Sequence, residues 1–270
     1  MPRSVQQLTS FCLSRLRSIP MAHVATVALA FGTLTVVTEA QVSGSAGPQV
    51  APMKTTIQIA IANDTGSEIT LPNPCPFYIS DSAGNVIFQP QCPAVIVRVK
   101  PGEVHRMTWG QRTSSGQRVL PGVYRIDFEV FNLGPQSIRI DQNADAGLTV
   151  VGPLRMGTSR QLFLSAPDEA GRWFVAAAAL SANAGIATCG GIFPLDADPL
   201  LRLSLRTNNG IFNNFVHQLD ASGETLLPQI AIPEVPGFGG LQMQLAFVTL
   251  DLEETCPLRV ISPSLAVLVQ

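Results

Sequence analysis

Charged residues are scarce in this 270-residue chain and make up 13% of it. The formal net charge at pH 7 is −2. A nucleic-acid-binding surface needs clustered lysine and arginine, so we expect no nucleic acid partner. Hydrophobic residues make up 46% of the chain, which excludes a disordered, highly charged polymer.

Catalytic signatures are also missing. The sequence contains no H-E-x-x-H, no G-x-S-x-G and no P-loop. Its three histidines are His23, His105 and His217, and the last two fall in strand-like patterns. We therefore expect neither an enzyme nor a cofactor, although a catalytic triad assembled only by the tertiary structure stays open.

Long apolar runs are absent as well. The longest, residues 24–37, is too short to span a bilayer comfortably. It follows three arginines, and Thr38 and Ala40 offer the small residues that a signal peptidase reads. We predict that residues 1–40 are a cleaved signal peptide and that the mature chain has no membrane span. Retention of the segment as an anchor is the alternative.

Cysteine usage is consistent with export. Once Cys12 leaves with the signal peptide, four cysteines remain: Cys75, Cys92, Cys189 and Cys256. Four cysteines allow three pairings, and we favour Cys75–Cys92 and Cys189–Cys256 because each pair brackets strands of one candidate domain. A four-cysteine metal site would need close C-x2-C pairs, which are absent; free buried thiols are the other alternative. We expect a secreted or cell-envelope protein.

Glycine and proline are abundant, at 22 and 21 residues, which is typical of a turn-rich β protein. In residues 97–131, the dipeptides Pro101-Gly102 and Pro121-Gly122 predict turns. After the second turn, residues 124–130 alternate between apolar and charged, as in a half-buried strand. This stretch predicts antiparallel β-sheet.

The domain organisation follows from the spacing of such strands. We predict a linker at residues 41–53, a β-sandwich domain at 54–150 and a second one at 160–270. Between residues 133 and 160 the pattern weakens, with one strand expected at 148–151. In the second domain, leucines alternating with polar residues at 201–206 predict another strand.

Four motifs of the first domain carry a family resemblance. They are IAIANDTGSEITL, YISDSAGNVIF, VKPGEVHRMTW and VLPGVYRIDFEV. Residues 54–133 resemble the BsuPI-type intracellular proteinase inhibitor domain. The resemblance implies an immunoglobulin-like sandwich and inhibition of a serine protease, but it assigns no inhibitory residue. The expected export and disulfide depart from an intracellular domain.

Three segments of the C-terminal half carry a second resemblance. They are FPLDADPLLRLSL, HQLDASGETLLPQIAIP and GLQMQLAFVTL. This half resembles a terminal β-rich domain of secreted and surface bacterial proteins. That resemblance implies an extracellular setting and no particular activity.

Candidate contact residues lie in two loops of the first domain, residues 72–76 and 110–120, because each is long, polar or stiffened by proline and anchored by strands. The candidates are Pro72, Asn73, Pro74, Pro76, Gln111, Arg112, Ser114, Ser115 and Arg118. The expected partner is a protein such as a serine protease or a cell-surface component. Ordinary connecting loops, in a structural or accessory protein of the cell envelope, are the alternative.

One short stretch has the spacing of a metal loop. Asp141, Asn143 and Asp145 follow a D-x-N-x-D pattern whose oxygens suit Ca²⁺. The pattern is incomplete, because Ala146 and Gly152 occupy the positions where an EF-hand needs glycine and glutamate. We expect a polar turn and no tight metal site. The sequence Asp-Ala-Asp-Pro at residues 196–199 is a weaker candidate of the same kind.

Overall fold

Strands dominate the part of the chain that this computed structural model describes, residues 41–206, 209–235 and 237–270. The predicted signal peptide lies outside these residues. Helix is confined there to a 3-10 turn, η1 (Pro167–Glu169), and to α2 (Pro199–Ser204). The prediction of an all-β protein with antiparallel sheets is confirmed. Within the same ranges, no helix has the length and apolar character needed to cross a membrane.

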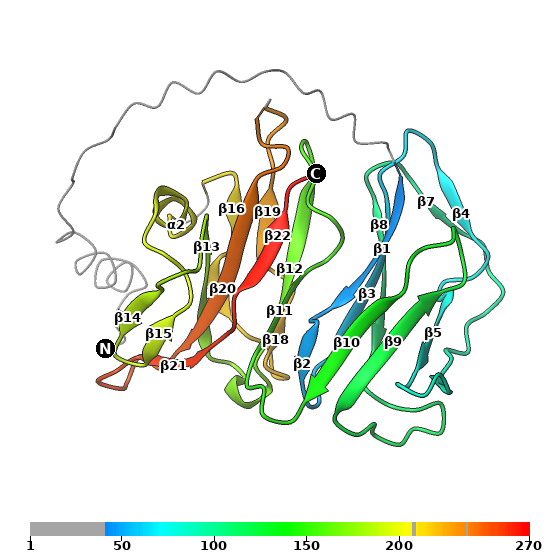
Figure 1. The fold of residues 1–270 in the computed structure, drawn as a ribbon, viewed down its shortest axis with the longest axis horizontal. Helices are drawn as coiled ribbons and strands as arrows, with labels where there is room; N and C mark the ends of the chain where they lie inside the picture. Colours follow the sequence, from blue (N-terminus) through cyan, green and yellow to red (C-terminus); the bar gives the residue numbers. More distant parts are fainter. Residues whose placement is uncertain (1–40, 207–208, 236) are drawn as a thin grey trace. The chain divides into compact units, whose positions relative to one another are not determined.

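The first sandwich consists of two sheets (Figure 1). One contains β1 (Val42–Gly47), β3 (Ile57–Asn63) and β8 (Val104–Trp109). The other has the order β2 (Val50–Pro52), β10 (Gln136–Asp141), β9 (Gly122–Phe128), β5 (Phe77–Ser80) and β6 (Val86–Phe88). A separate pair is formed by β4 (Ile69–Leu71) and β7 (Val97–Val99). The two sheets share one core, because the alternate residues of β3 and β9 point inward.

The order of strands in the first sandwich is that of an immunoglobulin-like fold. Strands β1, β3 and β8 form one sheet, β10, β9 and β5 form the other, and β6 is an edge strand. Near the start of β9, the Tyr124 hydroxyl donates a hydrogen bond of 2.6 Å to the Leu120 carbonyl. This contact is the tyrosine corner that immunoglobulin-like sandwiches use to fix the turn before that strand.

The second sandwich has the same layered form. One sheet contains β11 (Gly147–Val150), β12 (Ser159–Ser165), β19 (Gln229–Ala231) and β16 (Phe212–Asn213), with β18 (Glu224–Thr225) beside β12. The other contains β17 (Val216–Gln218), β13 (Trp173–Ala179), β20 (Gln242–Leu250), β21 (Leu258–Ile261) and β22 (Leu265–Leu268). A hairpin of β14 (Ile186–Thr188) and β15 (Gly191–Phe193) lies outside both sheets. The core between the sheets is apolar.

The two sandwiches contact each other through strands that are buried on both faces. All seven residues of β3 are buried. One face of the strand lies against the first core, and on the opposite face Ala60 packs with Val151 and Phe163. The Thr55 and Ser165 hydroxyls form a buried hydrogen bond of 2.8 Å across this contact. The division into domains at residues 54–150 and 160–270 stays a prediction. The structure shows in addition that the two sandwiches pack against each other.

The predicted linker at residues 41–53 is wrong, because these residues form β1 and β2. Strand β1 pairs with β3 from Val42 to Gly47, and β2 runs parallel to β10. The segment VSGSAG is small and polar, so its sequence has no apolar alternation. Its conformation is set by the neighbouring β3.

The predicted strand at residues 201–206 is also wrong, since residues 199–204 form α2. The Asp198 side chain caps the helix by accepting a hydrogen bond of 2.9 Å from the Leu201 amide, and Pro199 occupies the first turn. Alternating leucines over six residues cannot distinguish the two structures. The Asp-Pro start signal was the better guide.

Near the domain boundary, the structure corrects two details. Residues 136–141, in the segment whose alternation of apolar and polar residues is weak, form β10, and Ile138 and Ile140 are buried. The strand expected at 148–151 is present as β11, but it pairs with β12 in the second sandwich. The chain therefore enters the second sandwich before residue 150.

Candidate binding loops

The disulfide Cys75–Cys92 closes a pair of loops at one end of the first sandwich. The two Cα atoms are 6.2 Å apart, within the range that a disulfide requires. On the other side of the same loops, Leu71 of β4 pairs with Val97 of β7. Residues 72–74 and 93–96 are thus fastened to each other at both of their ends.

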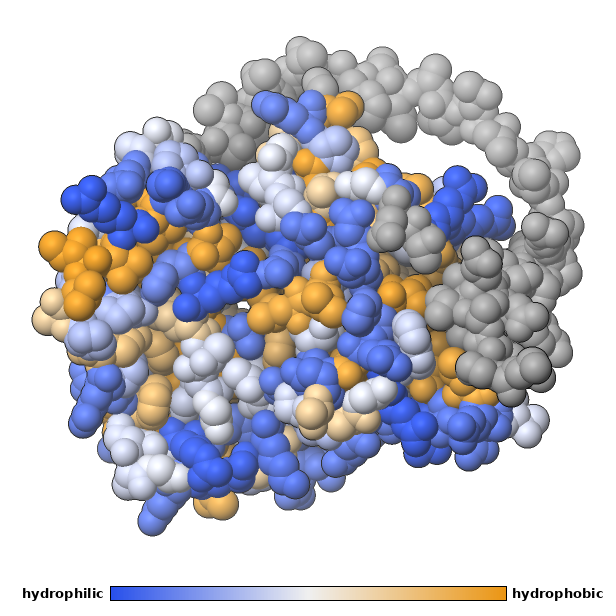
Figure 2. Space-filling view, turned by 180° about the vertical axis from the view of Figure 1, so that it is seen from behind, coloured by the Kyte–Doolittle hydropathy of each residue, from blue (hydrophilic) through white to orange (hydrophobic). Residues whose placement is uncertain are grey.

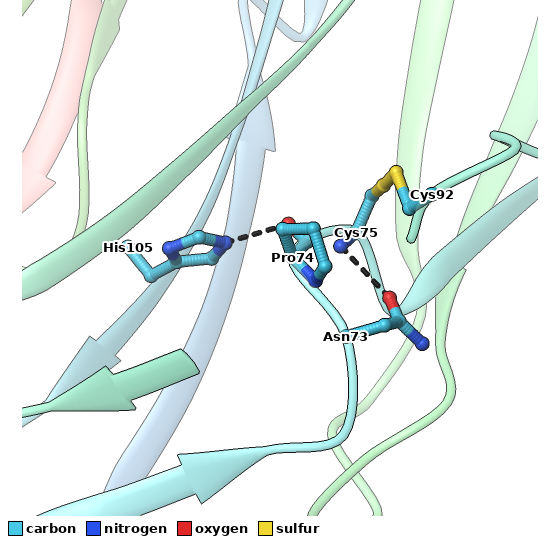
Figure 3. Close-up of a disulfide and its surroundings, with 5 residues drawn as sticks. All are labelled: Asn73, Pro74, Cys75, Cys92 and His105. Carbon is cyan, nitrogen blue, oxygen red and sulfur yellow. Dashed lines mark hydrogen bonds between the residues drawn. A yellow bond between two sulfur atoms is a disulfide. The ribbon is translucent and has the colours of Figure 1, made fainter. Parts of the chain in front are cut away.

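Hydrogen bonds fix the corner at residues 72–76 (Figure 3). The Asn73 side-chain oxygen accepts a bond of 2.8 Å from the Cys75 amide. The His105 ring, on β8, lies 2.7 Å from the Pro74 carbonyl through its Nε2. Because a carbonyl oxygen only accepts, Nε2 carries the proton in this contact. His105 therefore has a structural role as a clamp on the corner.

A third loop, residues 129–134, is fastened to the same corner. The Glu129 amide donates a hydrogen bond of 2.9 Å to the Pro76 carbonyl. The Glu129 carboxylate accepts one of 3.4 Å from the Gln89 side chain. In this loop Phe131 and Asn132 have positive φ angles of 56° and 48°. We call the three loops, residues 72–76, 89–96 and 129–134, the disulfide end.

The disulfide end presents apolar side chains to solvent. Val95 is 57% exposed, Ile96 65% and Phe131 43%. Residues 89–97 carry no charged side chain. Figure 2 shows hydrophobic side chains at the surface of the molecule. Four consecutive exposed residues, 93–96, differ from the scattered surface apolar residues of ordinary proteins.

The predicted loop at residues 110–120 leaves the first sandwich at the opposite end, since it precedes β9 whereas residues 129–134 follow it, but its tip folds back to Gln89 of the disulfide end. It is a tight hairpin in which Arg112 and Arg118 face each other in an isolated β-bridge. The Ser114 amide and hydroxyl hydrogen-bond to the backbone of Ile87 and Gln89 along the edge strand β6. Ser114 therefore joins this loop to the disulfide end at Gln89.

Two of the predicted contact residues cannot touch a partner, because they are buried. Gln111 has no exposed surface; its side chain donates to the Pro52 carbonyl and accepts from the Lys54 amide. Pro76, the last residue of the corner, is also buried. The remaining candidates are exposed or half-buried: Pro72, Asn73, Pro74, Arg112, Ser114, Ser115 and Arg118.

The candidate metal residues form a turn with internal partners. Asp141 accepts a hydrogen bond of 2.9 Å from the Asn143 amide and pairs with Arg139 at 2.9 Å. Asp145 is exposed. Across the described ranges, no three His, Cys, Asp or Glu side chains gather in a way that could hold a metal ion.

Asp196 and Asp198 anchor a loop of the second sandwich. The Asp196 carboxylate accepts hydrogen bonds from the Ser181 hydroxyl and from the amides of residues 183–185. These donors, the hydroxyl first, hold the pKa of Asp196 far below its usual value. Asp198 accepts from the Leu180 amide at 2.6 Å in addition to capping α2. Both carboxylates therefore accept their hydrogen bonds from this loop and from the start of α2.

The second predicted disulfide, Cys189–Cys256, is also present, with its Cα atoms 5.7 Å apart. It ties the turn between β14 and β15 to the segment before β21. His217, on β17, is exposed and lies beside the Trp173 ring, with a centroid distance of 6.4 Å.

Two features of the disulfide end escaped the sequence analysis. Val95 and Ile96 directly precede β7, which begins at Val97, yet both are exposed. The exposed Phe131 directly follows the alternating residues 124–130 and carries no motif. The only sequence signal was the pair of prolines, Pro90 and Pro93, which interrupt strand pairing around Cys92.

Comparisons with known proteins give no family. No family model matches the chain, and no curated protein matches it. Among solved structures, red sea bream transglutaminase is similar with a TM-score of 0.26 and 12% identity, over 100% of this chain and 34% of that one. Trypsin-activated alpha-2-macroglobulin from Escherichia coli gives 0.24 and 14%, over 84% and 15%. Murine CEACAM1b gives 0.23 and 13%, over 85% and 100%. The chain spans about a third of the transglutaminase, and these low scores carry no functional argument.

Proposed function

We propose that this protein is an extracytoplasmic, non-catalytic binding protein that inhibits a serine protease through the disulfide end of its first sandwich. The observation that carries the proposal is the fastening of three loops at that end. A disulfide, a hydrogen bond accepted by Asn73 and hydrogen bonds donated by His105 and Glu129 hold them while they present Val95, Ile96 and Phe131.

Fastened loops favour binding because little conformational entropy is lost when a partner docks. Exposed aromatic and aliphatic side chains on such loops supply the few contacts that dominate binding energies. The two disulfides support an oxidising compartment. The resemblance of residues 54–133 to BsuPI-type inhibitors supports a serine protease as the partner.

The test is an inhibition assay with the mature chain, residues 41–270, against a panel of secreted serine proteases. We expect inhibition at micromolar protein and its loss in Phe131→Gly. Glycine suits the positive φ of 56° at this position, so the variant removes the aromatic ring without straining the loop. The control is Leu227→Ser, since Leu227 lies in the second sandwich and is similarly exposed, at 46%.

A charge-reversed double variant, Arg112→Glu with Arg118→Glu, tests the other predicted loop. If it abolishes inhibition while Phe131→Gly does not, the contact lies in the loop of residues 110–120. If no protease of the panel is inhibited, the proposal fails, and a structural or accessory role in the cell envelope takes its place.

A further inference from the structure

We propose that the free edge of β8 binds an extended, acidic segment of a partner protein, which adds to the sheet as an antiparallel strand. Strand β8 (Val104–Trp109) is the last strand of the three-stranded sheet in the first sandwich. This inference does not rest on the proposed function, because it uses a different surface from the disulfide end.

The backbone of β8 has one paired side and one free side. It pairs antiparallel with β3, and in the described part of the chain it pairs with no other strand. Just before the strand, the Asn63 amide donates a hydrogen bond of 3.0 Å to the Glu103 carbonyl. Because hydrogen-bonded and non-hydrogen-bonded residues alternate along an antiparallel pair, the odd-numbered residues of β8 bond to β3. The amides and carbonyls of Val104, Arg106 and Thr108 therefore point away from the sheet.

The other sheet of this sandwich has a covered edge at β6. There the Ser114 amide donates a hydrogen bond of 3.0 Å to the Ile87 carbonyl, and its hydroxyl accepts one of 3.0 Å from the Gln89 amide. Along β8, in contrast, Arg106 and Thr108 are exposed. An exposed strand edge with unpaired backbone groups is a template for a further strand.

A hollow of about 370 Å³ lies beside β8. Its walls come from β7, from the turn before β8, from β8 itself and from the start of β12 in the second sandwich. Three arginines line it, Arg98, Arg106 and Arg160, against one carboxylate, that of Glu103. This carboxylate accepts a hydrogen bond of 2.9 Å from the Lys100 amide. A segment that adds to β8 would therefore place side chains in a cationic hollow.

Two of these arginines are available to a partner. The Arg160 side chain is only 3% exposed and is bonded to Asp64 at 2.7 Å. Arg106 is exposed and forms no ion pair among the residues that the structure describes. The Arg98 side chain is 73% exposed, and its ion pair with Glu68 is 3.7 Å long. Since directly opposite side chains of paired strands interact, a carboxylate opposite Arg106 would form a cross-strand ion pair.

The same charge argues against a second copy of this chain as the occupant. Two β8 strands that paired antiparallel over their three outward-pointing residues would place the two Arg106 side chains directly opposite each other. Like charges in that position destabilise a sheet. The edge therefore favours an acidic strand over a copy of itself.

The experiment measures the fluorescence anisotropy of a labelled peptide, Thr-Glu-Thr-Glu-Thr-Glu-Thr, on mixing with the chain from residue 41 onward, which lies within one compact unit. A peptide with lysine in place of each glutamate should bind at least about tenfold more weakly.

Two methylated peptides test the strand pairing. In an antiparallel pair, the glutamates opposite Val104, Arg106 and Thr108 also direct their amides toward β8. N-methylation of the glutamate amides should therefore weaken binding at least about tenfold, because it removes these hydrogen bonds. N-methylation of the threonine amides, which point away from β8, should leave binding unchanged.

Charge reversal tests the arginines. Arg98→Glu combined with Arg106→Glu should weaken binding of the glutamate peptide at least about tenfold. It should also create binding of the lysine peptide, a gain that misfolding cannot produce. The control is Arg112→Glu combined with Arg118→Glu, which makes the same change of net charge at two exposed arginines of the same sandwich. This control should bind both peptides as the wild type does.

Other outcomes overturn the inference. If both methylated peptides bind like their parent, the contact is only electrostatic and no strand is added. If no peptide binds at about millimolar concentration, or if the control reversal weakens binding equally, β8 is not the site. If sedimentation shows dimers that Thr108→Pro dissociates, a second copy occupies the edge, since proline removes the outward amide of Thr108 and no bond to β3. The protease inhibition assay tests the proposed function separately.

Discussion

Removing the charge of Asp64 tests the contact between the sandwiches. Its carboxylate lies 2.7 Å from Arg160 and 3.1 Å from Arg155, two residues of the second sandwich. The exposed side-chain fractions are 4% for Asp64, 3% for Arg160 and 11% for Arg155. Burial lowers the pKa of Arg160, and the neighbouring Asp64 carboxylate opposes that shift. One buried anion thus serves two cations.

The magnitude follows from which charge is left unpaired. Asp64→Asn leaves both arginines buried without a counter-charge. We therefore expect this variant to lower the unfolding free energy by about 3–5 kcal/mol. Arg160→Met keeps the Asp64–Arg155 pair but frees the Pro153 and Gly102 carbonyls, a loss of about 1–3 kcal/mol.

Arg155→Met should change the unfolding free energy by less than about 1 kcal/mol, because its Nε and the Asp64 oxygen are within ion-pair distance but are not aligned for a hydrogen bond. The expected order of destabilisation is therefore Asp64→Asn, then Arg160→Met, then Arg155→Met.

The assay is urea unfolding followed by tryptophan fluorescence. The chain has two tryptophans, Trp109 in the first sandwich and Trp173 in the second. Replacing each in turn by Phe gives a reporter for one sandwich. Because Asp64 contacts both sandwiches, Asp64→Asn should lower both transition midpoints.

A surface pair provides the control. Arg125 and Asp127 form an ion pair of 2.6 Å in which the arginine is 57% exposed, so Asp127→Asn should cost at most about 1 kcal/mol. If Asp64→Asn costs no more than Asp127→Asn, water reaches the cluster and the reasoning is wrong. If only the Trp109 transition moves, the contact does not couple the sandwiches.

Three further predictions concern single groups. Burial raises the pKa of Glu224, whose carboxylate accepts a hydrogen bond from the Thr56 amide across the contact. Ionisation of Glu224 therefore opposes folding. Glu224→Gln should leave the unfolding free energy unchanged well below pH 4.5, the ordinary glutamate pKa, and raise it increasingly above that pH. Urea titrations at several pH values measure this difference. Asp198→Ala should lower the unfolding free energy by about 1–2 kcal/mol because α2 loses its N-terminal cap. Its far-UV circular dichroism spectrum should differ from that of the wild type only in the small signal from this helix. Replacing Cys189 and Cys256 together by serine should cost about 4 kcal/mol for the 67-residue separation on the chain-entropy model, and non-reducing peptide mapping of the wild type should show Cys189 joined to Cys256.

The sequence by itself determined the fold class and the disulfides. Period-2 alternation in residues 124–130 depends only on one face being buried, and β9 has that pattern. The pairing of Cys75 with Cys92 could be expected because the hairpin of β5 and β6 returns the chain to its starting point. A short sequence pattern is enough to predict such features because residues close together in the chain determine them.

Other features were decided only by the tertiary structure. The small residues of β1 become a strand because β3 offers a pairing edge, and Ala60 is buried because Phe163 of the other sandwich covers it. The disulfide end is assembled from loops separated by dozens of residues in the chain. The exposure of Val95 also depends on this assembly: an apolar residue has the same local pattern whether a core covers it or water does, and only the arrangement of all the strands leaves it in water.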